Sequence, residues 1–186
     1  MDTMLIGICG KAGSGKDTIG DYLVKNYGFK KTALADPIRR IVKDIFVLDD
    51  YTVYDRTGRE QVLKNWPNWT VRKLLQIIGT ELFREHIDDA VWVKSLWYRI
   101  QSDPNSNYVI VDFRFPNELK FFKEHSKEGE FICLKVKRPG YDGNVGFSGH
   151  ASEAHDLQGD FEIINDGNFE SLYNKVDEII KKYFSP

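Results

Sequence analysis

The sequence predicts a single α/β domain in which a parallel sheet carries helices on both faces. Apolar runs of strand length alternate with segments of helical spacing along most of the chain. The run Tyr108–Val111 is continuously apolar, as expected for a strand buried on both faces of such a sheet. A glycine-rich loop separates the first predicted strand from the first predicted helix. With 186 residues the chain is long enough for one such domain and too short for two large ones.

The glycine-rich loop, Gly10–Thr18, follows the strand Met4–Cys9 and leads into a helix with apolar residues at helical spacing. In that order, backbone N–H groups and a helix N-terminus can surround a phosphate. The loop contains the pattern G-x4-G-K, whose lysine, Lys16, would reach the β- and γ-phosphates. The pattern alone also arises by chance, so the flanking strand and helix are what favour nucleotide binding. The residues expected to contact the nucleotide are Gly13, Ser14, Gly15, Lys16, Asp17 and Thr18.

Asp17 stands where most loops of this kind have Ser or Thr, whose hydroxyl binds Mg²⁺. Thr18 comes one position later, as the corresponding Thr does in nucleoside monophosphate kinases of the adenylate kinase type. This arrangement favours a small-molecule kinase over a GTPase. Two roles for Asp17 remain open: contact with a metal or its water, or stabilisation of the first helical turn.

The net charge of −2 gives no electrostatic argument for binding to nucleic acid or to a membrane. An anionic substrate must therefore be held by individually placed arginines. Cys9 and Cys133 lie in apolar strand-like runs and are expected to be buried thiols, outside any disulfide framework or metal site. The absence of a signal peptide or membrane-spanning run leads us to expect a cytoplasmic protein.

The next elements are a strand at Phe29–Leu34 and a helix that begins with Asp36 as N-cap and Pro37 in its first position. Segment 48–68 is expected to be irregular, without a core face, because it holds a turn at Arg56–Arg59 and the breaker Trp66-Pro67. It is either a mobile excursion over the site or a surface insertion, and we favour the first.

Thr70 is the expected cap of a further helix, in which Arg72, Gln76 and Thr80 recur every four residues. Such spacing puts the three side chains on one polar face, which is either functional or simply solvated. Asp88 is expected to cap the helix that follows.

In the second half, Asp112 and Arg114 directly follow the strand Tyr108–Val111. The carboxyl end of a central strand is where open α/β sheets bind ligands. Two more strands, Phe131–Val136 and Phe161–Ile164, and a C-terminal helix complete the pattern. The segment between the two strands is loop-like, and its His150 and His155 are better explained as loop histidines near a ligand than as metal ligands.

Taken together, the motifs resemble those of the bacteriophage deoxynucleoside monophosphate kinases nearly end to end, least so within 48–68. The matching stretches, in order, are Gly15–Thr18, Leu34–Ile38, Trp69–Gln76, Ile78–Leu82, Trp92–Lys94, Asp112–Arg114, Lys137–Gly140 and Ile164–Gly167. The resemblance implies a P-loop kinase fold, with a five-stranded parallel sheet expected in the order 2-3-1-4-5. It also implies ATP and Mg²⁺ as co-substrates and transfer of the γ-phosphoryl group to a deoxynucleoside monophosphate.

On this reading the residues divide by role. Lys16, Arg114 and Arg138 are expected to act in catalysis, and Asn165 and Gly167 to border the adenine. Arginine offers a phosphate a bidentate fork, so the acceptor-binding residues are expected to be Asp36, Arg39, Arg72, Gln76 and Arg114. Asp17, Thr18 and Asp112 are the expected metal-site residues, with Asp112 acting through water.

The expected organisation is one kinase domain over residues 1–186, with an acceptor-binding helical region at about 36–102 and a lid-like segment at about 138–155. The expected partner is a small-molecule deoxynucleoside monophosphate, not nucleic acid or membrane, and a homodimer is possible. If the chain is phage-encoded, its location would be the host cytoplasm. The alternatives are a kinase similar to dephospho-coenzyme A kinase and a non-enzymatic nucleotide-binding switch. The near-neutral charge disfavours a polynucleotide kinase.

Overall fold

The computed structural model describes residues 3–141 and 156–183. These residues form two compact units, each considered by itself below. The first unit comprises Met1–Ala33 and Trp97–Pro186, and the second comprises Leu34–Leu96. The chain therefore leaves the first unit once and returns to it once.

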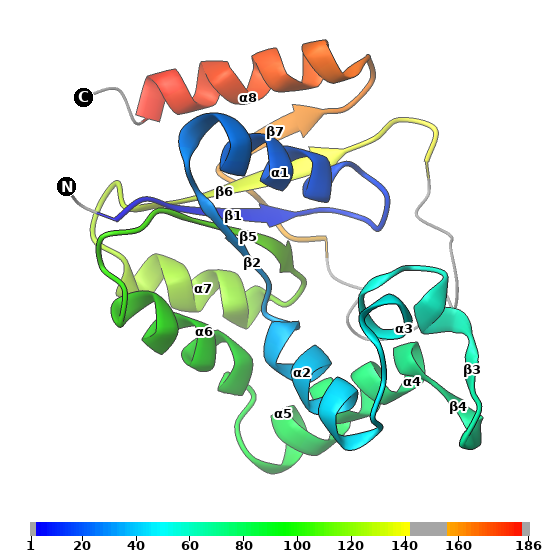
Figure 1. Ribbon diagram of the computed structural model, residues 1–186. Helices are drawn as coiled ribbons and strands as arrows, with labels where there is room; N and C mark the ends of the chain where they lie inside the picture. The colour runs from blue at the N-terminus through cyan, green and yellow to red at the C-terminus, as the bar shows by residue number, and fades with distance from the viewer. Residues whose placement is uncertain (1–2, 142–155, 184–186) are drawn as a thin grey trace. The chain divides into compact units, whose positions relative to one another are not determined.

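A five-stranded sheet lies at the centre of the first unit, in the order β2-β5-β1-β6-β7 (Figure 1). Its strands are β1 (Leu5–Cys9), β2 (Lys30–Thr32), β5 (Tyr108–Phe113), β6 (Phe131–Lys137) and β7 (Phe161–Ile164). All four neighbouring pairs are parallel. Numbered along the chain within this sheet alone, the order is 2-3-1-4-5, so the predicted topology is confirmed. The carboxyl ends of the strands consequently share one edge.

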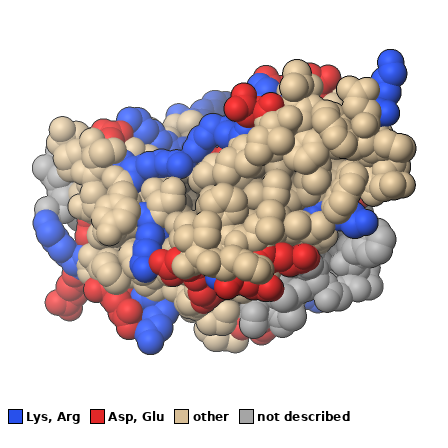
Figure 2. All heavy atoms as spheres, turned by 90° about the horizontal axis from the view of Figure 1, so that it is seen from below, with Lys and Arg blue, Asp and Glu red and all other residues tan. Residues whose placement is uncertain are grey.

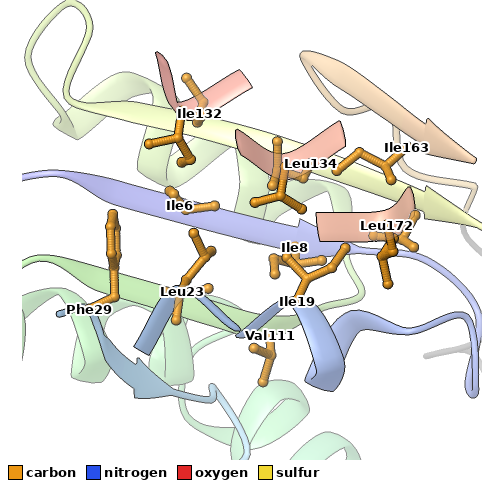
Figure 3. Close-up of a cluster of buried hydrophobic side chains, with 14 of the residues drawn as sticks. Ile6, Ile8, Ile19, Leu23, Phe29, Val111, Ile132, Leu134, Ile163 and Leu172 are labelled. Atoms are coloured by element: carbon orange, nitrogen blue, oxygen red, sulfur yellow. The ribbon is translucent and has the colours of Figure 1, made fainter. Parts of the chain in front are cut away.

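Helices α1 (Lys16–Tyr27) and α8 (Phe169–Tyr183) cover one face of this sheet (Figure 1). Figure 3 shows Ile6, Ile8 and Leu134 of the sheet meeting Ile19 of α1 and Leu172 of α8. All five side chains are at most 2% exposed. Burial of this apolar surface is the main term that holds the strand before the glycine-rich loop to the helix after it.

The opposite face of the sheet packs against α7 (Pro116–His125), a helix that the sequence analysis did not predict. The ring of Phe122 on α7 lies edge-on to Phe113 of β5, with centroids 5.4 Å apart. A Cβ on Gly7 of β1 would lie 2.7 Å from Phe113 Cε2, so only glycine leaves room for that ring. The carboxylate of Glu118 accepts hydrogen bonds from the backbone N–H groups of Arg114 and Phe115 and thereby caps α7.

Cys9 and Cys133, on the neighbouring strands β1 and β6, are free and buried, as predicted. Their Sγ atoms lie 3.8 Å apart. None of the helices in the described ranges 3–141 and 156–183 is long and apolar enough to cross a membrane.

The second unit packs short elements around an apolar cluster that includes Val42, Leu74 and Trp92. Its elements are α2 (Asp36–Ile45), α3 (Asp50–Tyr54), the 3-10 turn η1 (Gly58–Glu60), β3 (Val62–Leu63), β4 (Trp66–Thr70), α4 (Val71–Gln76), the π-helical turn η2 (Ile77–Leu82) and α5 (Phe83–His86). Helix α6 (Val91–Gln101) begins in this unit and ends in the first. Ahead of α6, the carboxylate of Asp88 accepts from the N–H of Ala90, in keeping with its predicted capping role.

Two expectations for this unit are wrong. Helix α2 starts one residue early, with Ala35 as its N-cap, and Asp36 instead accepts a hydrogen bond from Arg39. Segment 48–68 is largely regular: Val53 is fully buried, and Trp66-Pro67 opens β4, which pairs antiparallel with β3. The proline is compatible with a strand because this two-stranded ribbon has open edges. The expected mobility of the segment stays a prediction.

Thr70 caps α4 as predicted, since its Oγ1 accepts from the N–H of Lys73 at 3.2 Å. After Gln76 the backbone changes from α-helix to the π-helical turn η2. Thr80 lies inside this turn, and the expected alignment of Arg72, Gln76 and Thr80 on one polar face stays a prediction. The indole of Trp92 donates to the carbonyl of Gly79 inside this turn at 2.7 Å.

Candidate active site

The loop between β1 and α1 contains three glycines with positive φ: Gly10 (137°), Gly13 (76°) and Gly15 (108°). Residues with a Cβ rarely adopt this conformation, so the loop needs glycine at all three positions. Each glycine is also approached closely by a different segment of the first unit. The atoms nearest to the positions of the missing Cβ atoms are Val136 O for Gly10 (2.3 Å), Tyr141 Oη and Cε1 for Gly13 (2.7 Å) and Asn165 Nδ2 for Gly15 (2.6 Å).

Lys16, the first residue of α1, folds its side chain back over the loop. Its Nζ donates to the carbonyl oxygens of Gly10 at 2.6 Å and Lys11 at 2.7 Å. Burial, followed by the neighbouring Arg114 guanidinium, lowers the pKa of Lys16 to about 8, against the opposing effect of Asp17 and Asp112. A polyanion in this loop would favour the charged form of the lysine.

Ser14 lies inside the same loop and is only 2% exposed. Its Oγ has no hydrogen-bond partner within the described ranges 3–141 and 156–183. A buried hydroxyl without a partner is costly unless a ligand or water satisfies it. The residues present therefore fit a nucleotide phosphate: the loop offers an unsatisfied hydroxyl, a lysine and a helix N-terminus.

Asp17 points its carboxylate towards β2, where its Oδ1 lies 3.0 Å from Lys31 Nζ. The same ammonium group contacts Asp21, one turn further along α1, at 2.9 Å. These contacts show an ion pair with β2 and decide neither of the two roles left open for Asp17. The metal-binding role predicted for Asp17 and Thr18 stays a prediction.

Asp112 and Arg114, at the end of β5, lie near Lys16, as their influence on its pKa shows. The structure thus brings together three residues that the sequence analysis assigned to one edge of the sheet. Arg138, which follows β6, lies with its guanidinium 5.7 Å from the ring centroid of Tyr141, the residue that covers Gly13. Most of the expected lid, residues 142–155 with His150 and His155, lies outside the described residues.

The turn between β7 and α8 also meets the glycine-rich loop. Asn165 donates from its side-chain Nδ2 to the carbonyl oxygen of Ser14 at 2.9 Å. Gly167, the other predicted adenine neighbour, is exposed in this turn and packs close to Ser171.

The remaining predicted site residues belong to the second unit. Arg39 Nη1 donates to Asp36 Oδ1 at 2.9 Å, and its buried Nε has no partner among the described residues. Arg72, in the first turn of α4, forms an ion pair through its Nε with Glu60 of η1. Gln76 is the last residue of α4, one turn after Arg72. Glu60 was missed by the sequence analysis, and no spacing pattern points to it.

Comparison with known proteins identifies the family. The family model described as "Deoxynucleotide monophosphate kinase" matches residues 4–52 and 44–176. The chain belongs to the deoxynucleotide monophosphate kinase family. The resemblance drawn from the ordered motifs is thereby confirmed.

Two relatives of the family align over nearly their whole length. A putative deoxynucleotide monophosphate kinase of Acanthamoeba polyphaga mimivirus is 32% identical over 189 residues, which cover 93% of this chain and 94% of the relative. The deoxynucleotide monophosphate kinase of Enterobacteria phage T4 is 24% identical over 246 residues, covering 95% of this chain and 98% of the phage protein. Because that alignment is longer than this chain, the phage protein carries insertions relative to it.

Among solved structures, the dephospho-CoA kinase from Campylobacter jejuni aligns with a TM-score of 0.50 and 15% identity, covering 96% of both chains. At that identity the likeness shows the fold alone. This chain thus shares its architecture with that kinase, which agrees with the P-loop kinase fold expected from the sequence.

Proposed function

We propose that this member of the family transfers the γ-phosphoryl group of ATP, with Mg²⁺, to a deoxynucleoside 5′-monophosphate. The observation that carries the proposal is the cluster of Lys16, Asp112 and Arg114 beside the glycine-rich loop in a member of this family. Phosphoryl transfer needs little covalent chemistry from the protein. It needs two anionic substrates held in line and positive groups around the moving phosphoryl group.

The ATP side of the site would use the loop amides, the Ser14 hydroxyl and Lys16. Mg²⁺ supplies charge neutralisation between the phosphates, and Asp112, Thr18 and Asp17 are the residues proposed to hold it. Lys16 is already close to carbonyl oxygens that a phosphate would replace as its partner.

The acceptor phosphate requires individual arginines, because the protein carries a net charge of −2. On the face shown in Figure 2, basic and acidic side chains are interspersed and do not gather into one basic area. Within the first unit we propose Arg114 as a residue that binds the acceptor phosphate. Within the second unit, considered by itself, Arg72 and Arg39 are the residues proposed for that role. Asp36 would orient Arg39, and Gln76 would lie nearer the base.

Arg138 is the proposed lid arginine, placed after β6 and next to a segment that would exclude water from the transfer. Its guanidinium lies 5.7 Å from the ring centroid of Tyr141, and the Tyr141 ring itself approaches Gly13 of the loop. An additional positive group there would stabilise charge that develops on the transferred phosphoryl group.

The test is an assay of ATP-dependent ADP formation with four acceptor conditions: deoxynucleoside monophosphates, ribonucleoside monophosphates, dephospho-coenzyme A and no acceptor. We expect rapid ADP formation only with one or more monophosphates, and a deoxynucleoside diphosphate as the second product. Turnover with dephospho-coenzyme A alone would indicate the alternative kinase. ATP binding without any acceptor-dependent turnover would indicate a nucleotide-binding switch.

A further inference from the structure

Asn165 connects two loops of the first unit that are far apart in the sequence. Its Nδ2 donates to the carbonyl oxygen of Ser14 in the glycine-rich loop at 2.9 Å. Its backbone N–H donates to the carbonyl oxygen of Lys137, at the end of β6, at 2.7 Å. The side chain therefore reaches the loop from a backbone that is itself hydrogen-bonded to the neighbouring strand.

The turn that carries Asn165 is anchored on both sides. Lys175 of α8 donates from Nζ to the carbonyl oxygen of Ile164 at 2.6 Å and to the carboxylate of Asp166 at 2.7 Å. These two contacts bracket Asn165 in the chain. The turn that carries the Asn165 amide is thus fixed by hydrogen bonds on both sides of this residue. The amide is therefore suited to holding the Ser14 carbonyl in one orientation.

The contact sets the direction of one backbone N–H. In a trans peptide the C=O and the following N–H point in opposite directions, and the structure contains no cis peptide among its described residues. Holding the Ser14 carbonyl towards Asn165 therefore turns the N–H of Gly15 away from it. Gly15 is the N-cap of α1, so its N–H belongs to the set of donors that a helix N-terminus offers to an anion.

We propose that Asn165 is a positioning residue that orients the Ser14–Gly15 peptide so that the Gly15 N–H is directed at a nucleotide phosphate. The inference rests on the proposed function, in which a nucleotide phosphate occupies the glycine-rich loop. It gives the Asn165 side chain a role other than the adenine contact expected from the sequence. It also explains Gly15: a Cβ there would lie 2.6 Å from Asn165 Nδ2.

A role in orienting a phosphate donor differs measurably from a contact with the base. Loss of the Asn165 amide should lower the affinities for ATP, GTP and inorganic tripolyphosphate by the same factor, because all three present a polyphosphate to the loop. A base contact would instead alter the ratio of ATP to GTP affinity and leave tripolyphosphate, which has no base, unaffected.

The experiment measures dissociation constants of the full chain for ATP, GTP and tripolyphosphate by calorimetry, and the KM for the acceptor, in Asn165→Ala. We expect each of the three dissociation constants to rise about five- to tenfold, as for one lost hydrogen bond, with an unchanged acceptor KM. Asn168→Ala is the matched control. It removes an amide from the same turn that caps α8 through the N–H of Ser171, and it should leave all three affinities unchanged.

If Asn165→Ala does not fold, Asn165→Ser replaces it, since the shorter hydroxyl cannot span the contact to Ser14. Equal affinities in wild type and variant would overturn the inference, and so would weaker ATP binding with unchanged tripolyphosphate binding. A wild-type protein that binds neither ATP nor tripolyphosphate would instead overturn the nucleotide site itself, together with this inference.

Discussion

The carboxylate of Glu60, in the 3-10 turn η1, forms an ion pair with the Nε of Arg72, in the first turn of α4. Asp55 shapes the turn that presents Glu60, because its Oδ1 accepts from the N–H groups of Thr57 at 2.7 Å and Gly58 at 3.1 Å. A contact at Nε leaves the opposite edge of the guanidinium, with its two terminal amino groups, for a bidentate ligand. The ion pair therefore orients Arg72 as an acceptor-phosphate fork would require.

Glu60→Gln should accordingly raise the KM for the deoxynucleoside monophosphate about three- to tenfold, because the uncharged amide holds the guanidinium less firmly. The KM for ATP should stay unchanged. Steady-state kinetics with each substrate varied in turn provide the measurement. Glu85→Gln, an exposed glutamate of α5, serves as the control and should behave as wild type. If Glu60→Gln has a normal acceptor KM while Arg72→Ala has a raised one, the proposed role of Glu60 is refuted and that of Arg72 is retained.

Arg114→Lys keeps a positive charge at the end of β5 and loses the planar fork. We expect it to raise the acceptor KM or lower kcat by about tenfold or more, equivalent to about 1.4 kcal/mol, with ATP affinity almost unchanged. Arg72→Ala should show the same selectivity for the acceptor. If both variants lose ATP binding and keep normal acceptor binding, the two substrate assignments are reversed.

The lowered pKa of Lys16 predicts a pH dependence of ATP binding. With a pKa of about 8, caused first by burial and then by Arg114, the lysine of the unliganded protein loses its proton as the pH rises through 8. ATP binds the charged form, so its affinity should be highest below pH 8 and fall by up to about tenfold per pH unit above it.

Calorimetric titrations between pH 7 and 9.5 measure this fall. Lys16→Arg is the matched variant, because arginine stays protonated throughout that range. Its ATP affinity, whatever its absolute value, should be nearly independent of pH. An equal fall in wild type and Lys16→Arg would assign the pH dependence to another group.

Trp92→Phe should destabilise the second unit by about 1–3 kcal/mol, because it leaves the buried Gly79 carbonyl of the π-helical turn without its indole donor. Urea unfolding followed by circular dichroism measures the loss. Trp97→Phe is the comparison, because Trp97 contacts Phe121 and Phe122 through its ring. This variant should lose less stability than Trp92→Phe. A wild-type midpoint for Trp92→Phe would show that the hydrogen bond contributes little to stability.

Most of the sheet was predictable because β1, β5, β6 and β7 contain short apolar runs and the first loop has a recognisable pattern of glycines. Strand β2 is polar and covers only Lys30–Thr32 of the longer strand that was predicted. The convergence of Lys16, Asp112 and Arg114 followed from the same fold, since parallel strands end at one edge. Helix α7 was missed because it has few apolar residues and begins only a few residues after β5. A start signal was nevertheless present, since Pro116 is followed by Glu118. The hairpin β3–β4 was missed because Trp66-Pro67 was taken as an interruption.

The partners of individual side chains were harder to foresee. The Glu60–Arg72 pair depends on a turn folded by Asp55, and the Asn165–Ser14 bond joins residues 151 positions apart. Neither pairing leaves a periodic signal in one sequence. The π-helical turn, whose Gly79 carbonyl accepts from Trp92, likewise leaves no signal in the helical spacing read from Arg72 onwards.

The second unit, Leu34–Leu96, is inserted between β2 and the end of α6 and contains none of the five strands of the main sheet. It is joined to the rest of the chain at only two peptide junctions, near Ala33 and Trp97. The unit is therefore one continuous stretch of chain that can be exchanged as a single piece. A graft of the corresponding segment from a relative, cut at these two junctions, would exchange the proposed acceptor arginines Arg39 and Arg72 while every strand that supports the glycine-rich loop keeps its own sequence.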